Sequence, residues 1–390
     1  MKKKKFIILI IIIICAGLII WYFNTFTIKT NYEIIESEKI VDEITIIQIS
    51  DFHGISFGRN NKELIKKIEK EKPDIICVTG DMYTAKDEKG KQIALKLLQE
   101  LAKSYKVYFV NGEHDCDEKF IKNLKDNEVN VLDYKKETIA IKNTKINLYG
   151  ITNQYYSATF DLKNAFEINK EEYNILLAHI SNFEEFEQFG IDLSLCGDTH
   201  GGQVRLPFLG AIINRGIWFP EIVQKGLNVE TNYIKGLYNI NNSYLYVSSG
   251  LGNYPISIRL FNRPEIAVIK LRWLTNILFS INELISGEKI NDLDYKEKAE
   301  ENLIVALENS TFTLKEKIEF HKKKWLKEHI FDIVLCIIVW LVVIVALKLQ
   351  NAEGYLIGTI SGILAVFFYV VRYNQMMIYV EDRVYKKIEK

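Results

Sequence analysis

The chain has 390 residues, with 50 basic and 50 acidic side chains, so its formal net charge at pH 7 is zero. No global charge attracts it to nucleic acid, and a nucleic-acid partner is not expected. Apolar residues make up 48% of the chain, enough for a sizeable core, and no Pro/Ser/Gly-rich linkers divide it. These features predict one large domain plus membrane elements.

The first apolar stretch, residues 6–23, follows four lysines and contains no charge. Its length approaches the roughly 20 residues needed to cross a bilayer. The sequence WYFNTF at its end lacks the small-x-small site that a cleavable signal peptide requires. Residues 1–23 are therefore predicted to form an N-terminal transmembrane anchor that is retained.

Two further apolar runs, 333–349 and 355–371, lie near the other end of the chain and are separated by a short polar turn. They predict a transmembrane helical hairpin over residues 330–371. Its small residues Gly354, Gly358 and Gly362 favour close helix packing, either within the hairpin or between two copies, so the oligomeric state stays open. Residues 273–329 are predicted to be a helical, basic juxtamembrane stalk, and residues 372–390 a charged tail.

Between residues 42 and 272, short β-branched runs alternate with helical stretches, which predicts a layered α/β domain. Each of five apolar runs is followed within three residues by an acidic or histidine side chain. Open α/β sheets place their ligand sites at the carboxyl ends of strands. The candidate site residues at these ends are Asp51, His53, Asp81, Glu113, His114, Asp115, His179, Asp198 and His200.

Carboxylates and imidazoles brought together in this way suit two divalent metal ions that share one aspartate. In a two-metal site both ions clamp the attacking and leaving oxygens of an in-line displacement, and a bound water becomes a nucleophile near neutral pH. The expected reaction is therefore hydrolysis of phosphate mono- or diesters.

The order and spacing of the motifs resemble those of the calcineurin-like metallophosphoesterase superfamily over about residues 44–271. The matching motifs are D-x-H at Asp51, G-D at Asp81, G-E-H-D at Glu113, a lone histidine at His179 and G-D-T-H at Asp198. The runs VSSGLGNYP (247–255) and IRLFNRPEI (258–266) are similar to the membrane-associated bacterial branch. The resemblance implies a layered sandwich of two mixed β-sheets flanked by helices.

The resemblance also implies a role for each candidate residue. His114 would stabilise charge or protonate the leaving group, and Asp115 beside it would orient it. Asp81 would bridge the two ions. The first ion would be held by Asp51, His53 and His200, and the second by Asp81, Glu113, His179 and Asp198.

Two positions differ from the family pattern, because Glu113 replaces an asparagine and Asp198 replaces a histidine. Both replacements are oxygen donors, which favours a retuned site that prefers manganese, iron or magnesium over zinc at the second position. In the alternative, Glu113 or Asp198 turns away to pair with a lysine or arginine, leaving a single-metal enzyme. A weak or inactive pseudoenzyme, acting as a membrane-bound binding module, is the other alternative.

The sequence gives contradictory indications of the side of the membrane on which the catalytic domain lies. Lys2 to Lys5 predict a cytoplasmic N-terminus and an external catalytic domain, yet basic residues flank the predicted hairpin on both sides. Because large domains translocate with little regard to charge, we expect a multi-pass protein of the cell membrane with an extracytoplasmic catalytic domain. Anchoring raises the local concentration of lipid-linked or cell-envelope phosphoesters, which favours them as substrates. Arg259 and Arg263 could bind phosphate, or be surface or salt-bridged residues.

Overall fold

The computed structural model describes residues 2–152, 162–206, 209–222 and 233–273. The chain divides into two units, residues 1–274 and residues 275–390. The predicted stalk, hairpin and tail lie outside the described residues, apart from Trp273.

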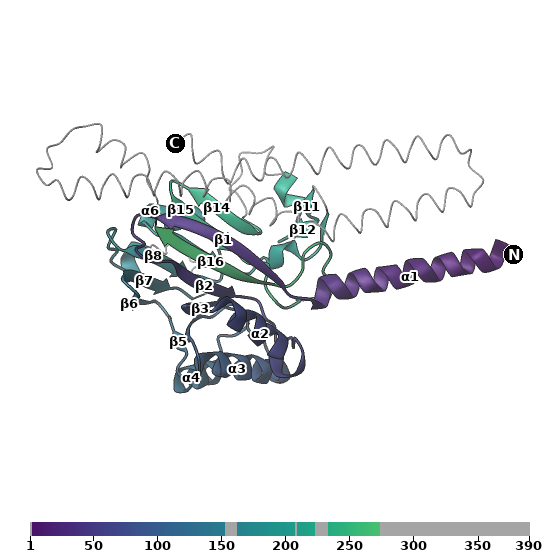
Figure 1. Ribbon diagram of the computed structural model, residues 1–390, viewed down its shortest axis with the longest axis horizontal. Coiled ribbons are helices and arrows are strands. Elements are labelled where there is room, and N and C mark those ends of the chain that lie inside the picture. The colour runs from purple at the N-terminus through teal and green to yellow at the C-terminus, as the bar shows by residue number, and fades with distance from the viewer. Residues whose placement is uncertain (1, 153–161, 207–208, 223–232, 274–390) are drawn as a thin grey trace, which may run out of the picture. The chain divides into compact units, whose positions relative to one another are not determined.

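The first of two six-stranded sheets has the strand order β1-β16-β2-β3-β4-β5 (Figure 1). The strands β2 to β5 run parallel, whereas β16 is antiparallel to β2 and parallel to β1. The strand β1 lies before residue 42 and was not predicted. The strands are β1 (Lys29–Ser37), β2 (Ile44–Ile49), β3 (Ile75–Thr79), β4 (Lys106–Val110), β5 (Asn130–Val131) and β16 (Glu265–Trp273).

The second sheet has the order β14-β15-β9-β8-β7-β6. Its four central strands are parallel, and β14 and β6 are antiparallel to their neighbours. Both sheets are therefore mixed, which confirms the predicted pair of mixed sheets. The strands are β6 (Lys135–Ile141), β7 (Thr144–Gly150), β8 (Tyr173–Leu177), β9 (Leu193–Cys196), β14 (Gly236–Ile240) and β15 (Ser243–Val247).

The central strands are apolar runs rather than alternating patterns because both of their faces are buried. Every residue of β2 and β3 is buried. One core lies between the sheets, where Ile46 and Ile75 belong to the same cluster as Ile175 and Leu193. Two outer cores separate the sheets from the helices.

Helices cover the outer faces of both sheets, which completes the flanked sandwich that the sequence predicted. The N-terminus of α4 is capped by Asp117, whose side chain accepts a hydrogen bond from Phe120 N at 2.8 Å. The helices are α2 (Lys62–Glu71), α3 (Glu88–Ala102) and α4 (Glu118–Asp126) on the first sheet, and α5 (Leu162–Ala165) and α6 (Phe183–Phe189) on the second.

The remaining elements are short and lie in the loops that follow β2 and β9. Two 3₁₀ turns, η1 (Arg59–Asn61) and η3 (His200–Gly202), occur in loops. Two small antiparallel pairs follow η3: β10 (Arg205–Leu206) with β11 (Gly210–Ala211), and β12 (Ile213–Asn214) with β13 (Ile217–Trp218).

The N-terminal helix α1 (Lys2–Phe26) leads directly into β1. Its C-terminal end is bound to the domain, since Trp21 Nε1 donates to Ser257 O at 3.1 Å and Arg263 Nε donates to Thr27 Oγ1 at 2.9 Å. Within the described residues, no helix is long and apolar enough to cross a membrane. The transmembrane anchor therefore stays a prediction.

Candidate active site

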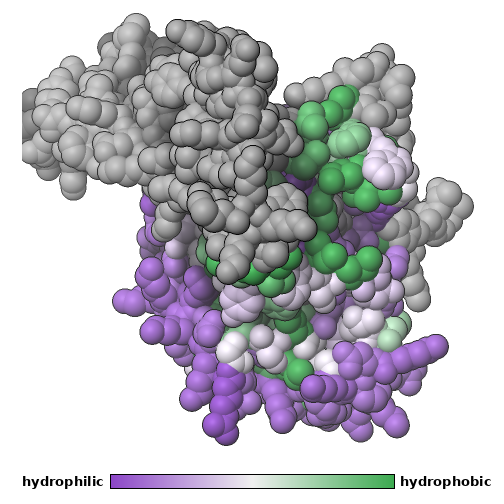
Figure 2. Space-filling model, turned by 90° about the vertical axis from the view of Figure 1, so that its right-hand side faces the viewer, coloured by the Kyte–Doolittle hydropathy of each residue, from purple (hydrophilic) through white to green (hydrophobic). Residues whose placement is uncertain are grey.

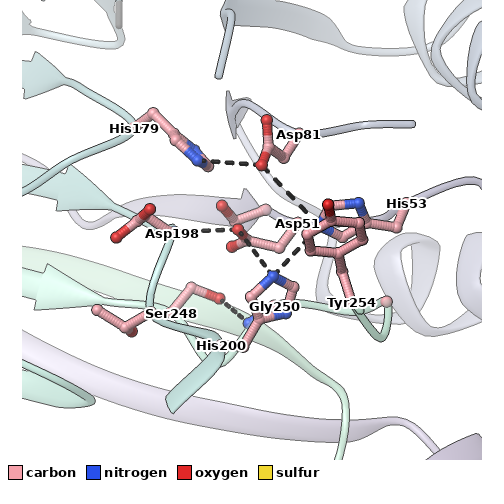
Figure 3. Close-up of polar contacts among 12 residues, drawn as sticks. Asp51, His53, Asp81, His179, Asp198, His200, Ser248, Gly250 and Tyr254 are labelled. Atoms are coloured by element: carbon pink, nitrogen blue, oxygen red, sulfur yellow. Dashed lines mark hydrogen bonds and ion pairs between the residues drawn. The ribbon is translucent and has the colours of Figure 1, made fainter. Parts of the chain in front are cut away.

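Four loops at the carboxyl ends of strands from both sheets meet at one place (Figure 3). The loop after β2 carries Asp51 and His53, and the loop after β3 carries Asp81. From the second sheet, His179 follows β8, and His200 lies in the loop after β9. The apolar strands end together because they are neighbours in parallel sheets, and this brings side chains distant in sequence within reach of one another.

The first group of potential metal ligands is Asp51, His53 and His200, whose ligand atoms all lie within 4.8 Å of one another. The Nε2 atoms of His53 and His200 are 3.2 Å apart. His200 Nε2 lies 3.8 Å from Asp51 Oδ1. These three residues are the set that the family resemblance assigns to the first ion.

The second group is Asp51, Asp81 and His179, so Asp51 belongs to both groups. Asp81 Oδ2 lies 3.3 Å from His179 Nε2 and 3.9 Å from His53 Nε2. The Asp81 carboxylate therefore stands between the imidazoles of the two groups, where a bridging ligand is needed. The structure also makes Asp51 a candidate for the shared position, which the sequence did not indicate.

Two buried polar atoms of this centre, Asp51 Oδ2 and His179 Nε2, have no hydrogen-bond partner in the described part of the chain. Leaving such atoms unsatisfied costs about 1–3 kcal/mol each, and a cation between them would offset that cost. The opposite ring nitrogens are held: His179 Nδ1 donates to Thr79 O at 2.7 Å, and His53 Nδ1 contacts Thr84 Oγ1 at 3.0 Å. Partners of this kind are typical of metal-binding histidines.

The backbone of the centre is strained in a way that is uncommon for residues other than glycine. Asp51, Asp81 and His200 have φ values of 48°, 55° and 50°, in the left-handed region. Such conformations cost on the order of 1–3 kcal/mol each and cluster at functional sites. At Gly112 no side chain fits, because a Cβ there would overlap the Asp81 carboxylate.

Burial and mutual charge set the protonation of the four central side chains. Burial raises the pKa of Asp51 to about 7 and lowers the pKa of His53 to about 4. Burial alone would raise the pKa of Asp81, but the neighbouring His179 imidazole holds it below its usual range. The charge of Asp81 in turn holds the pKa of His179 well above its usual range, against the effect of burial. Neutral His53 and anionic Asp81 are the forms that bind metal.

Two predicted ligands of the second ion, Glu113 and Asp198, lie outside both ligand groups. Glu113 is exposed. The Asp198 carboxylate forms an ion pair with Arg215 Nη2, while its backbone N–H donates to Asp51 Oδ1 at 3.0 Å. This pairing is the alternative that the sequence left open for Asp198, and the assignment of both residues to the metal stays a prediction.

Asp115 is fully buried, and both of its carboxylate oxygens accept backbone hydrogen bonds. The donors are Met82 N at 2.8 Å and Gly112 N at 2.6 Å. Asp115 therefore joins the loops that follow β3 and β4, and it positions His114 only through the loop that the two residues share.

His114 is held at the edge of the centre by two backbone contacts. Its own N–H donates to Asp81 Oδ1 at 2.9 Å, and its Nδ1 accepts from Ala85 N at 3.2 Å. Because a backbone N–H can only donate, Nδ1 carries no proton and the ring proton is on Nε2. This tautomer can donate a hydrogen bond from Nε2 to a charged oxygen.

The structure adds two residues whose roles the sequence did not reveal. The Tyr254 ring stacks on His53, with centroids 5.2 Å apart and an angle of 11° between the rings. Arg259 is fully buried, and its Nη2 donates to Ser249 O at 2.7 Å and Gly252 O at 2.6 Å. Arg259 thus stabilises the loop beside the centre instead of being a surface or salt-bridged residue. Both residues lie in the runs VSSGLGNYP (247–255) and IRLFNRPEI (258–266), whose similarity to the bacterial branch was the sequence feature that could have indicated them.

Comparison with known proteins agrees with this geometry. Residues 44–202 match the family model described as calcineurin-like phosphoesterase. The chain is 27% identical over 254 residues to the uncharacterized metallophosphoesterase YkoQ of Bacillus subtilis (strain 168), covering 62% of this chain and 90% of YkoQ. It is 27% identical over 268 residues to YkuE, an uncharacterized metallophosphoesterase of the same organism, covering 64% and 88% of the two chains. The phosphodiesterase YaeI of Escherichia coli (strain K12) is 28% identical over 208 residues, covering 52% and 71%.

Proposed function

Because the chain belongs to the calcineurin-like phosphoesterase superfamily and is a hydrolase of phosphoric esters, we propose that it is a membrane-attached, two-metal phosphoesterase. The observation that carries the proposal is the pair of ligand groups, Asp51–His53–His200 and Asp51–Asp81–His179, with Asp81 between the imidazoles. A lipid-linked or cell-envelope phosphoester is the proposed substrate class, because attachment to a membrane concentrates such substrates.

The chemistry divides between the ions and the protein. Two divalent ions, when bound, polarise the phosphoryl group and lower the pKa of a water molecule. The chain orients His53 and His179 through Thr84 and Thr79, so that their Nε2 atoms face the centre. His114, with its proton on Nε2, would donate a hydrogen bond to a phosphoryl oxygen and stabilise the charge that develops there.

The test of the proposed function is turnover of a generic aryl phosphodiester combined with metal analysis. We expect two ions per chain under saturating manganese, and a loss of turnover in chelator that is restored by added metal. Two bound ions without turnover would instead support the pseudoenzyme, and a single ion held by Asp51, His53 and His200 would support a single-metal enzyme.

The predicted preference for hard ions at the second site gives a separate prediction. The double change Glu113→Asn with Asp198→His replaces two carboxylates with a carboxamide and an imidazole, which zinc accepts more readily. We expect the ratio of zinc-supported to manganese-supported turnover to rise by about tenfold. Arg215→Gln is the matched control, because it removes the partner of Asp198 and leaves both carboxylates. An unchanged ratio in the double variant would contradict a role for these residues at the metal.

We further propose that the catalytic unit lies outside the cytoplasm. The support is the uncharged run of residues 6–23 behind four N-terminal lysines. Cys116 is exposed, whereas Cys77 and Cys196 are buried. In intact cells we expect a membrane-impermeant thiol reagent to label wild-type protein but not a Cys116→Ser variant at this position. Labelling of Cys116 only after lysis would place the unit in the cytoplasm.

A further inference from the structure

Exposed apolar side chains are concentrated in three segments of the described chain. Large exposed residues occur on α1, in residues 209–222 and in residues 254–258, and only Val41 and Trp273 lie elsewhere. Figure 2 shows apolar side chains gathered on one face, next to a hydrophilic region. Contiguous apolar patches on a protein surface mark contact sites. We define the apolar rim as Leu209, Ile213, Ile217, Trp218, Ile222, Tyr254, Ile256 and Ile258.

The two segments of the apolar rim are linked to each other and to α1 by hydrogen bonds. Arg205 N donates to Leu260 O at 3.0 Å, which joins the start of β10 to the loop that carries Ile256 and Ile258. Trp21 Nε1 of α1 donates to Ser257 O, between those two isoleucines. In Figure 1, β11 and β12 accordingly lie at the same end of the domain as the C-terminal end of α1. The rim and the C-terminal end of α1 therefore lie at the same end of the domain.

The charge of these segments also fits a lipid surface. Residues 252–263 contain no acidic side chain, and Glu221 is the single acidic residue of 209–222. The Glu221 carboxylate is engaged by Arg205 Nη2 and by Ala211 N, both at 2.6 Å. No unpaired negative charge of these segments would thus repel anionic headgroups. Tryptophan and isoleucine on such a surface are typical of interfacial contact.

The rim begins at the mouth of the metal centre. Tyr254 stacks on His53, and Ile256, two residues further, is 61% exposed. We propose that the apolar rim seats on a lipid bilayer and so brings the mouth of the site to the level of the phosphate headgroups. We choose a bilayer as the partner because residues 6–23 of α1, which are uncharged and predicted to enter a membrane, lead to the same end of the domain. The proposal depends on the membrane attachment proposed above, but its test does not depend on turnover.

The test measures which solvent surrounds the rim in the full chain reconstituted in phosphatidylcholine–phosphatidylglycerol vesicles. A nitroxide is attached to Ile256→Cys or Trp218→Cys, in a background in which Cys15, Cys116 and Cys336 are serine. The matched control is Val41→Cys, because Val41 is 59% exposed and Trp218 is 62% exposed. Electron paramagnetic resonance compares collisions with lipid-soluble oxygen and with a water-soluble nickel chelate.

The measured quantity is the ratio of collisions with oxygen to collisions with the nickel chelate. We expect this ratio to be about tenfold higher at Ile256 and Trp218 than at Val41. Equal ratios at all three positions would overturn the proposal. Protection of the rim from both reagents would also overturn it, because another part of this chain or a second copy would then cover it. A second copy is identified by dipolar broadening between nitroxides on the two chains, which dilution with unlabelled protein removes. Turnover of a soluble aryl phosphodiester shows separately whether each labelled variant is folded and whether the proposed function holds.

Discussion

Asp81→Asn is expected to lower turnover of an aryl phosphodiester by roughly 10³-fold without unfolding the protein. The substitution keeps the size of the side chain, and an amide oxygen can still accept the hydrogen bond from His114 N. It removes the negative charge between His53 and His179, and with it the ligand best placed to serve both ions. Metal analysis should accordingly show fewer than two ions per chain.

Asp117→Asn is a matched control for this change. Asp117 is another loop carboxylate of the same sheet, but it caps α4 and pairs with Lys91 at 3.0 Å, away from the ligand groups. Its substitution should lower the free energy of unfolding by about 1 kcal/mol or less and leave turnover unchanged. Wild-type turnover in Asp81→Asn, with two ions still bound, would require the bridging assignment to be abandoned.

The ligand-bearing loops could be predicted because local sequence determines where buried strands end. The runs ITIIQI and IICVT are mostly apolar, without alternation, because both faces of β2 and β3 are buried. A polar residue directly after such a run must lie at the edge of the sheet. Asp51, Asp81 and His179 were therefore expected at one edge, and the structure brings them within 4.8 Å.

Other features of the site depend on contacts between distant segments, which no local pattern specifies. Asp198 and Arg215 are separated by the short strands after η3, and their pairing follows from how that segment folds back. Tyr254 reaches His53 across 201 residues because Leu251 N and Gly252 N donate to Ser50 O and Asp51 O, which joins the two loops. The strand β1 was missed because its residues KTNYEIIES include many polar side chains and it pairs with the last strand, β16.

His114→Ala is expected to reduce kcat/KM by about 10²-fold, and by a similar factor for phosphodiesters with good and with poor leaving groups. The physical reason is the tautomer of His114. Ala85 N donates to Nδ1, so a second ring proton would break that hydrogen bond. A neutral imidazole stabilises charge by donating a hydrogen bond from Nε2, but it is too weak an acid to protonate a leaving group. The measurement is the slope of log kcat/KM against leaving-group pKa for a series of aryl phosphodiesters.

His114→Gln distinguishes the two possible roles of this side chain. A glutamine carboxamide can donate a hydrogen bond at a similar distance from the backbone, but it cannot act as an acid at neutral pH. If His114 acts through a hydrogen bond, His114→Gln should retain about tenfold more activity than His114→Ala, with the same slope as the wild type. A loss that grows with leaving-group pKa, and is equal in the two variants, would show instead that a protonated imidazole acts as the general acid. The Ala85 contact would then have to break during turnover.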